Sequence, residues 1–152
     1  MENIIVKKLK EKFEPYIEEI KEWRGELTIK VKKFKIFEIC KFLHDDKDLD
    51  FDYLSNVCGV DYYPKKPRFE VVYHLYSIKK NHRVRIKVSV DESDLTVDSV
   101  TDIWGSANWH EREIYDMFGI KFLNHPDLRR ILMPDEWEGH PLRKDYPLEG
   151  YD

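Results

Sequence analysis

Two stretches in the middle of the chain alternate apolar and polar residues with a period of two. In residues 69–75 every second side chain is apolar, and residues 84–90 repeat the pattern after a short polar turn. Such alternation places the apolar side chains of a strand on one face. Because a polar turn joins the two stretches, the pattern predicts a β-hairpin with one buried face.

Three other segments show the spacing of an amphipathic helix, with apolar residues three or four positions apart. Residues 3–13 carry apolar side chains at four-residue steps with lysines opposite, and residues 34–44 show a similar spacing. The third segment, residues 108–118, ends at Gly119, which can adopt the left-handed conformation that terminates many helices. We therefore predict a helix at each of the three positions.

The third of these helices has an apolar face and a polar face. Its turns place on the inner, apolar face Ala107, His110, Ile114, Met117 and Phe118. The adjoining polar face consists of Trp109, Arg112, Glu113 and Asp116. Asp116 is therefore expected on the polar side of the helix.

The remaining segments give shorter signals. Residues 27–31 and 57–63 predict strands, and residues 16–23 are ambiguous between a strand and a second helical piece. Residues 99–102 resemble the N-terminal box of a short helical turn that ends at Gly105. Together with the hairpin, these segments predict an α+β fold in which helices pack on a mixed or antiparallel sheet.

The chain changes character after residue 122. Prolines recur among charged side chains in residues 123–152, and each proline restricts the residue before it to an extended conformation. We predict a compact α/β domain at residues 1–122 and an extended, proline-rich C-terminal arm at residues 123–152. A segment of this composition can bury little of itself on itself, so we expect the arm to lie against another protein.

Length and charge narrow the function classes. The 152 residues, 41% of them hydrophobic, suit one compact domain with an appendage. Charged residues make up 37%, against roughly 25% in an ordinary soluble domain, which favours a thermophilic source. The formal net charge of −4, with both signs interleaved, argues against nucleic acid as the main partner. No apolar run reaches the roughly 20 residues that span a bilayer, so we expect a cytosolic chain or a peripheral one on a membrane complex.

Few residues could hold a cofactor. Cys40 and Cys58 lie far apart in the sequence, whereas a structural zinc or an iron–sulfur cluster uses about four soft ligands, usually in close pairs. The chain also lacks a glycine-rich dinucleotide motif, a phosphate loop and a nucleophile elbow. We therefore expect two free cysteines that act as small hydrophobic residues, and no cofactor on this chain.

Two metal-site hypotheses involve the histidines. The zinc-protease pattern of two histidines four residues apart fails at His110, because Ile114 occupies the second position. A metal-dependent hydrolase could instead use His110, His125 and His140, with Asp116 or Asp127. The two later histidines both precede proline, which favours a role in turns, so the hydrolase is the less favoured alternative.

The acidic residues of the third helix suggest a further kind of chemistry. Glu111, Glu113 and Asp116 could perform acid–base catalysis if burial separated their pKa values. Arg112 lies among them and favours a network of paired charges instead.

The charged residues of the last third of the chain form a specific pattern. It consists of Glu111-Arg112-Glu113, Asp116-Met117-Phe118, His125, Arg129 and Ile131, followed by His140-Pro141-Leu142-Arg143-Lys144-Asp145-Tyr146-Pro147-Leu148. Upstream, the matching residues are Val60-Asp61-Tyr62, the strand that begins at Arg68, and Ala107-Asn108-Trp109. The pattern closely resembles the 30 kDa subunit family of respiratory complex I, and the resemblance spans most of the chain from about Phe51.

The resemblance implies a small α/β subunit in the hydrophilic arm of an NADH:quinone oxidoreductase. In that family the subunit has no redox centre and packs against the large subunit that lines the quinone site. Iron–sulfur clusters, flavin and quinone are then expected on partner subunits, and the chain is expected on the cytoplasmic face of the cell membrane as a peripheral component. Its work would be assembly and support of electron transfer.

By the same resemblance, the acidic residues of the third helix would brace the arm through its arginines, and the arm would run over the partner. The residues assigned to this interface are Glu111, Arg112, Glu113, Asp116, His125, Asp127, Arg129, Arg130, His140, Arg143, Lys144 and Asp145. Asn124 stands where the family usually has glycine, and asparagine tolerates the positive φ that such a turn needs.

Other assemblies fit the same residues. A membrane-bound nickel–iron hydrogenase, or a relative driven by ferredoxin or F420H2, has a homologous subunit, and the electron donor would be bound on another chain. A free-standing binding module remains a third alternative.

Overall fold

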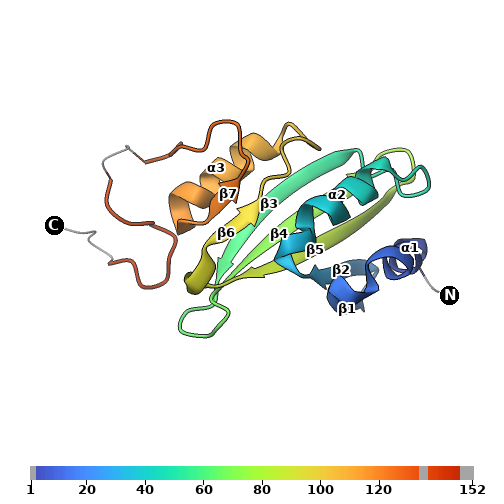
Figure 1. Ribbon diagram of the computed structural model, residues 1–152, viewed down its shortest axis with the longest axis horizontal. Coiled ribbons are helices and arrows are strands. Elements are labelled where there is room, and N and C mark those ends of the chain that lie inside the picture. The colour runs from blue at the N-terminus through green and yellow to red at the C-terminus, as the bar shows by residue number, and fades with distance from the viewer. Residues whose placement is uncertain (1–2, 134–136, 148–152) are drawn as a thin grey trace.

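The computed structural model describes residues 3–133 and 137–147 of the chain. Its largest element is a five-stranded sheet in the order β1-β2-β5-β4-β3, in which β2 and β5 run parallel and the other neighbours antiparallel. The strands are β1 (Ile17–Trp23), β2 (Glu26–Val31), β3 (Tyr53–Asp61), β4 (Phe69–Ser77) and β5 (His82–Val90). The mixed sheet with packed helices confirms the predicted α+β class (Figure 1).

The predicted hairpin is confirmed as β4 and β5. Their register runs without interruption from the pair Phe69 and Val90 to the pair Ser77 and His82. The apolar residues of both strands are buried on one face, as the alternation predicted. Asn81 adopts a positive φ of 49° in the connecting turn, a conformation that asparagine tolerates.

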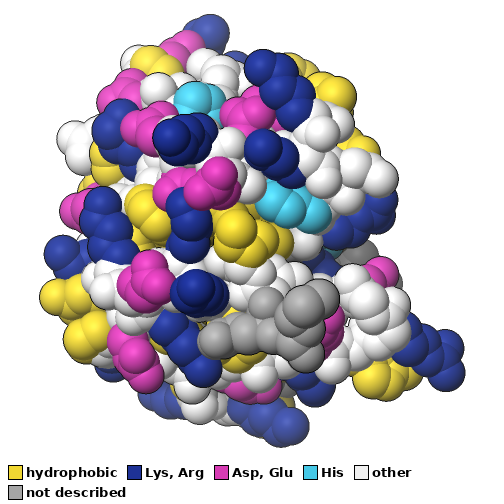
Figure 2. Space-filling view, turned by 90° about the vertical axis from the view of Figure 1, so that its right-hand side faces the viewer, with side chains coloured by type: hydrophobic (Ala, Val, Ile, Leu, Met, Phe, Trp, Pro, Cys, Tyr) yellow, Lys and Arg dark blue, Asp and Glu magenta, His cyan; other side chains and the backbone are white. Residues whose placement is uncertain are grey.

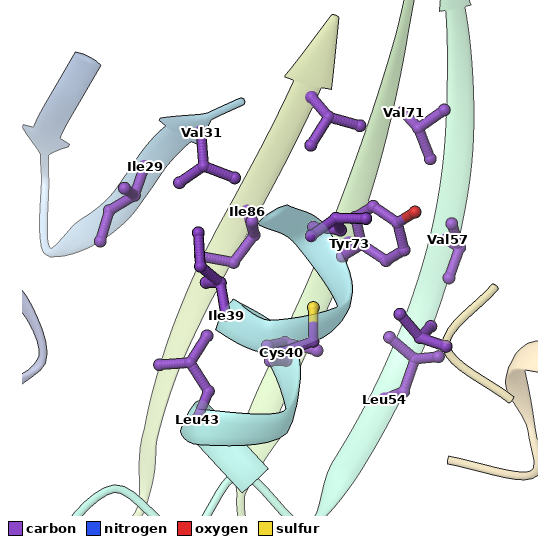
Figure 3. Close-up of a cluster of buried hydrophobic side chains, with 14 of the residues drawn as sticks. Ile29, Val31, Ile39, Cys40, Leu43, Leu54, Val57, Val71, Tyr73 and Ile86 are labelled. Atoms are coloured by element: carbon purple, nitrogen blue, oxygen red, sulfur yellow. The ribbon is translucent and has the colours of Figure 1, made fainter. Parts of the chain in front are cut away.

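Two helices from the first half of the chain cover part of the apolar face of the sheet. They are α1 (Ile4–Phe13), with the Asn3 side chain accepting a hydrogen bond from the Ile5 amide, and α2 (Ile36–Asp45). In Figure 3, Ile39 and Cys40 of α2 point at strand residues such as Tyr73. Cys40 is fully buried there, which agrees with its expected role as a small hydrophobic residue. Short 3-10 turns lie at Glu14–Tyr16, Lys33–Lys35 and Glu92–Asp94.

The third predicted helix is confirmed as α3 (Ala107–Phe118), which ends at Gly119 with a φ of 84°. In the sequence it stands between two short strands that pair in parallel, β6 (Thr96–Asp98) and β7 (Lys121–Leu123). These strands were not predicted, because three residues are too few to show an alternation of apolar and polar side chains. The helix packs closely on β3: a Cβ added to Gly59 would lie 2.9 Å from the Phe118 ring. Glycine at this position therefore permits the contact between helix and sheet.

Three local predictions need correction or refinement. The ambiguous segment 16–23 is a strand, because it pairs with β2 in a hairpin. The strand predicted at 57–63 begins earlier, at Tyr53, and ends at Asp61. The segment after Ser99 forms one turn, in which the Val100 carbonyl accepts from the amides of Ile103 and Trp104, and does not extend into a helix.

The predicted faces of α3 are wrong at Asp116 and His110, and Glu111, which the prediction placed on neither face, is also buried. Glu111 and Asp116 are both fully buried, whereas His110 is only half-buried. The physical reason is that neighbouring segments donate hydrogen bonds to both carboxylates, so burial does not leave them without partners. Hydrophobic spacing along one helix does not contain that information.

Beyond β7, residues 124–133 and 137–147 contain no helix or strand. These residues lie on the left of Figure 1, and the Leu142 amide donates to the Met117 carbonyl at the C-terminal end of α3. Asn124 has a φ of 66°, in agreement with the turn expected there. The division of the chain at residue 122 and the contact of an extended arm with a partner stay predictions. No helix in the described part of the chain is both long and apolar enough to cross a membrane.

The molecular surface carries both signs of charge. On the side shown in Figure 2, Lys and Arg side chains lie interleaved with Asp and Glu, and no large patch of one sign appears on that side. This matches the interleaving noted in the sequence.

Candidate functional site

Asp116, near the end of α3, organises the segment that follows β7. Its Oδ2 accepts hydrogen bonds from three consecutive backbone amides, those of Ile131 (3.1 Å), Leu132 (2.7 Å) and Met133 (2.8 Å). Its Oδ1 accepts from Arg130 Nε. A single buried carboxylate thus fixes the course of four residues that lie 14 to 17 positions further along the chain.

The charge of Asp116 is kept by these donors. Burial alone would raise the pKa of the carboxyl group, but hydrogen bonds from Arg130 and from the amides of Met133 and Leu132 outweigh it, so the pKa lies below its ordinary value. Asp116 is therefore ionised at neutral pH.

Arg130 connects Asp116 to the next part of the segment. Besides Asp116 Oδ1, its guanidinium donates to the backbone carbonyls of Asp116 (3.1 Å), Trp137 (2.5 Å) and Gly139 (2.8 Å). The planar fork of arginine suits several acceptors in fixed directions. The predicted bracing of the arm by Asp116 through an arginine is therefore seen in the structure as an intramolecular contact.

The segment around residue 140 satisfies the last carbonyls of α3. His140 Nδ1 donates to the Asp116 carbonyl (2.8 Å), the Leu142 amide to Met117 (3.1 Å) and Arg143 Nε to Phe118 (2.7 Å). A helix leaves its final carbonyls without partners inside the helix, and its C-terminal end attracts cations. The expected pairing of Arg143 with an acid of α3 is not found, because Arg143 caps the helix instead.

A buried arginine holds the end of the described segment. Arg68 donates in bidentate fashion to Asp61, with both distances 2.9 Å, and its Nη2 lies 2.6 Å from Asp145 Oδ1. The Lys144 amide also donates to Asp61 (2.8 Å). Burial alone would raise the pKa of Asp61, but these donors and the Tyr63 amide hold the pKa at about 2. Asp145 and Lys144 thus meet the sheet at its β3–β4 end.

Sequence reasoning did not assign Asp61 or Arg68 to the site. Both appeared only as parts of the resembling pattern, because their partner Asp145 lies 77 residues away from Arg68. The usable signal was an arginine and an aspartate on either side of a turn between two strands, a position where a buried ion pair can form.

Glu111 braces a different element from the one expected. Its Oε1 accepts from Ser99 Oγ (2.6 Å) and its Oε2 from the Val100 amide (2.9 Å), so it ties α3 to the turn after β6. Burial raises the pKa of Glu111 to about 7, although the hydrogen bonds from Ser99 and Val100 act in the opposite direction. The predicted contact of Glu111 with the arm is limited to His125, whose Nε2 lies 4.0 Å from Oε1.

The other assigned residues occupy the surface of this region. Arg112 Nε donates to the Arg129 carbonyl (3.3 Å), and the Arg129 side chain pairs with Asp127 (3.1 Å) in an exposed salt bridge. Exposed pairs of this kind add little stability. Glu113 is half-buried beside a cavity of about 210 Å³ that is also lined by Leu142.

The histidines do not converge. His125 Nε2 contacts the Asn108 carbonyl (3.2 Å) while its Nδ1 accepts from the Asp127 amide (2.9 Å), and His140 contacts the Asp116 carbonyl. Within residues 3–133 and 137–147, no group of three or more His, Cys, Asp or Glu residues is placed to hold a metal ion. The geometry favours the turn roles over a hydrolase site.

Around these polar contacts, several large apolar side chains remain exposed. Trp109 on the outer side of α3 is 55% exposed, Leu132 55% and Leu142 56%. The polar residues therefore shape the segment, while apolar side chains next to them face outward. Tryptophan and arginine, which both occur in this region, are enriched in binding hot spots.

Comparison with known proteins identifies related chains. The family model described as respiratory-chain NADH dehydrogenase, 30 Kd subunit, matches residues 29–152. An NADH-quinone oxidoreductase subunit of Geotalea uraniireducens is 55% identical over 150 residues, covering 99% of this chain and 90% of the relative. The same subunit of Geobacter sulfurreducens is 52% identical over 151 residues, with 99% and 92% covered.

Two solved structures are also similar. A trypsin-resistant fragment of Nqo5 aligns with a TM-score of 0.68 and 34% identity, covering 82% of this chain and 100% of the fragment. A chain of the membrane-bound sulfane sulfur reductase, an archaeal respiratory membrane complex, aligns with a TM-score of 0.79 and 28% identity, with 95% and 84% covered.

Proposed function

This chain belongs to the 30 Kd subunit family of respiratory-chain NADH dehydrogenase, and we propose that it acts as the non-catalytic structural subunit of a complex I-type NADH:quinone oxidoreductase. Its partners are other subunits of such a membrane-associated complex. Within it, the chain packs against the large subunit that lines the quinone site, in the peripheral arm on the cytoplasmic face. Flavin, iron–sulfur clusters and quinone are bound by the partners, and this chain supports electron transfer by holding them in place.

The observation that carries the proposal is the different use of polar and apolar side chains on α3 and in the segment after β7. The charged residues Asp116, Arg130 and Arg143 are used in intramolecular hydrogen bonds, whereas Trp109 and Leu132 are left exposed beside them. A segment whose polar groups are already satisfied can bury its apolar side chains in a partner without stranding charges. The surface is therefore preorganised for docking.

The separation of a compact domain from a C-terminal arm has further support. A trypsin-resistant fragment of Nqo5 aligns over its whole length with 82% of this chain. This supports a compact, protease-resistant domain that accounts for most of the chain, with the rest as an appendage. We propose that residues 123–152 form the arm that reaches the partner.

A second candidate is the equivalent subunit of another membrane-bound respiratory complex, of hydrogenase type or driven by ferredoxin or F420H2. The likeness to a chain of the sulfane sulfur reductase favours it, but at 28% identity against 55% for the NADH-quinone oxidoreductase relative. Neighbouring genes for NADH-binding subunits, or for hydrogenase maturation, separate the two candidates.

The test compares assembly with folding. The double variant Trp109→Ala, Leu132→Ala is expected to keep the melting temperature of the isolated chain, because both side chains are exposed. It should lower the yield of assembled complex about 30-fold, which corresponds to the roughly 2 kcal/mol of binding free energy lost with a hot spot. Ile4→Ala, 44% exposed at the start of α1, is the matched control and should assemble normally. Normal assembly of the double variant would refute the proposal.

A further inference from the structure

The side of the five-stranded sheet away from α1 and α2 is covered by no helix or strand in the described part of the chain. We call it the outer sheet face. One row across all five strands marks it, formed by the aligned residues Lys21, Thr28, Arg85, His74 and Asn56. The row alternates along the strands with the apolar residues that α2 covers in Figure 3, so it lies on the opposite side of the sheet.

The outer sheet face is hollowed. A cavity of about 310 Å³ at one end is lined by Tyr53, Tyr76, Arg83 and Arg85 among others. A second hollow of about 350 Å³ is lined by Trp23, Lys21 and again Arg85, so the two adjoin. Trp23 is 62% exposed and Tyr53 49% exposed. Large aromatic side chains thus stand at both ends of one concave surface.

The charges on this face differ in sign from the protein as a whole. The strand residues that point outward include five cations, Lys21, Lys30, Arg83, Arg85 and Lys87, and three carboxylates, Glu19, Glu26 and Glu70. The whole chain has a net charge of −4. Glu26 pairs with Arg85, and Glu70 lies 3.5 Å from Lys87, so part of the positive charge is neutralised locally and an excess remains.

A sheet face that only meets water requires polar residues and neither exposed aromatics nor hollows. Tryptophan, tyrosine and arginine on a concave surface are the composition of a binding hot spot. The carboxylates between the cations disfavour a uniform polyanion such as nucleic acid, whose affinity depends on uninterrupted cationic contacts. A protein segment with acidic side chains at intervals matches this spacing of charges.

We propose that the outer sheet face is a second docking surface, which binds an acidic segment of another subunit of the complex. Carboxylates of that segment meet Arg83 and Lys21, and one of its side chains enters the cavity beside Tyr53. The inference rests on the proposed function only in that the chain works within an assembly; it concerns a surface separate from α3 and the arm.

The test places a photoreactive benzoylphenylalanine at Tyr53 in the intact complex, with the same residue at Phe34 as control, since Phe34 is 58% exposed and precedes α2. Irradiation is expected to join Tyr53, but not Phe34, to a peptide of another subunit that contains at least two Asp or Glu residues. Arg83→Glu should lower the yield of this adduct about tenfold, as expected for one interfacial charge contact, whereas Lys10→Glu on α1 should not.

The inference would be overturned by an adduct with lipid, by an adduct with a peptide that lacks acidic residues, or by no adduct while a probe at Trp109 reacts with a partner. The last result would leave the proposed function intact and remove only the second surface. If neither probe reacts with a partner, both proposals fail. If Arg83→Glu leaves the yield unchanged, the acidic character of the partner is refuted.

Discussion

Replacing Asp116 by asparagine tests whether one buried carboxylate fixes the segment after β7. Four donors converge on the two oxygens, three of them backbone amides on Oδ2 and one the Arg130 guanidinium on Oδ1. The amide of asparagine offers one acceptor oxygen and one donor nitrogen. Whichever way it is turned, at least one donor loses its partner and faces an N–H group.

The size of the effect follows from the kind of bond that is lost. A hydrogen bond to a charged group contributes about 1.5–3 kcal/mol. Residues 131–133 are half-buried or exposed, so the segment can open to water while β4 stays folded. The change should therefore appear as local opening. In Asp116→Asn, exchange of the amides of Ile131, Leu132 and Met133 should accelerate about 10- to 100-fold at neutral pH.

Native-state hydrogen exchange followed by NMR measures both quantities in one sample. The amides of β4, such as that of Tyr73, serve as the internal control and should keep their protection. Equal acceleration in β4 would show that the segment belongs to the global folding unit. Unchanged exchange at residues 131–133 would show that Asp116 does not hold them.

Three further changes test other contacts. The free energy of unfolding should fall by up to about 3 kcal/mol as pH rises from about 4.5 to about 7, because the Glu111 carboxyl has a pKa of about 7 in the folded protein and loses its proton at lower pH in the unfolded chain. Urea titrations should show a flatter pH dependence of stability for Glu111→Gln. An equal pH dependence in both proteins would contradict this. Arg68→Met leaves the buried Asp61 carboxylate without its cation and should lower the free energy of unfolding in urea by about 3–5 kcal/mol. Most of this loss should be recovered when Asp61→Leu is added. A double variant as unstable as the single one would refute the ion-pair reasoning. Gly59→Ala brings a Cβ to 2.9 Å from the Phe118 ring and should lower the stability measured by thermal unfolding by about 1–3 kcal/mol. Adding Phe118→Leu should restore part of that loss. A Gly59→Ala variant as stable as the unchanged protein would disprove the close contact.

The parts of the fold that could be predicted from sequence are those defined by local periodicity. The β4–β5 hairpin and the helices α1, α2 and α3 each carry their own repeating pattern over nine or more residues. The strands β6 and β7 have three residues each, and their pairing depends on α3 folding back between them. Nothing in a three-residue stretch indicates such a pairing.

Sequence indicated part of the site's membership, without Asp61 and Arg68, and few of its contacts. The resembling pattern contained Asp116 and Asp145, the interface it implied added Arg130, and the structure gives each of the three a partner. It did not indicate that Glu111 bonds to the turn after β6, because a buried carboxylate cannot be recognised without its donors. The partner of Asp145 was equally hidden, since Arg68 lies on a strand far away in the sequence.

The central claim is that the surface formed by α3 and the following segment binds a neighbouring subunit. Amide exchange of the isolated chain, compared with that of the same chain within the purified complex, tests it most directly. We predict that protection on assembly increases most at Trp109 and at residues 124–133. Protection that increases elsewhere and leaves these residues unchanged would contradict the claim.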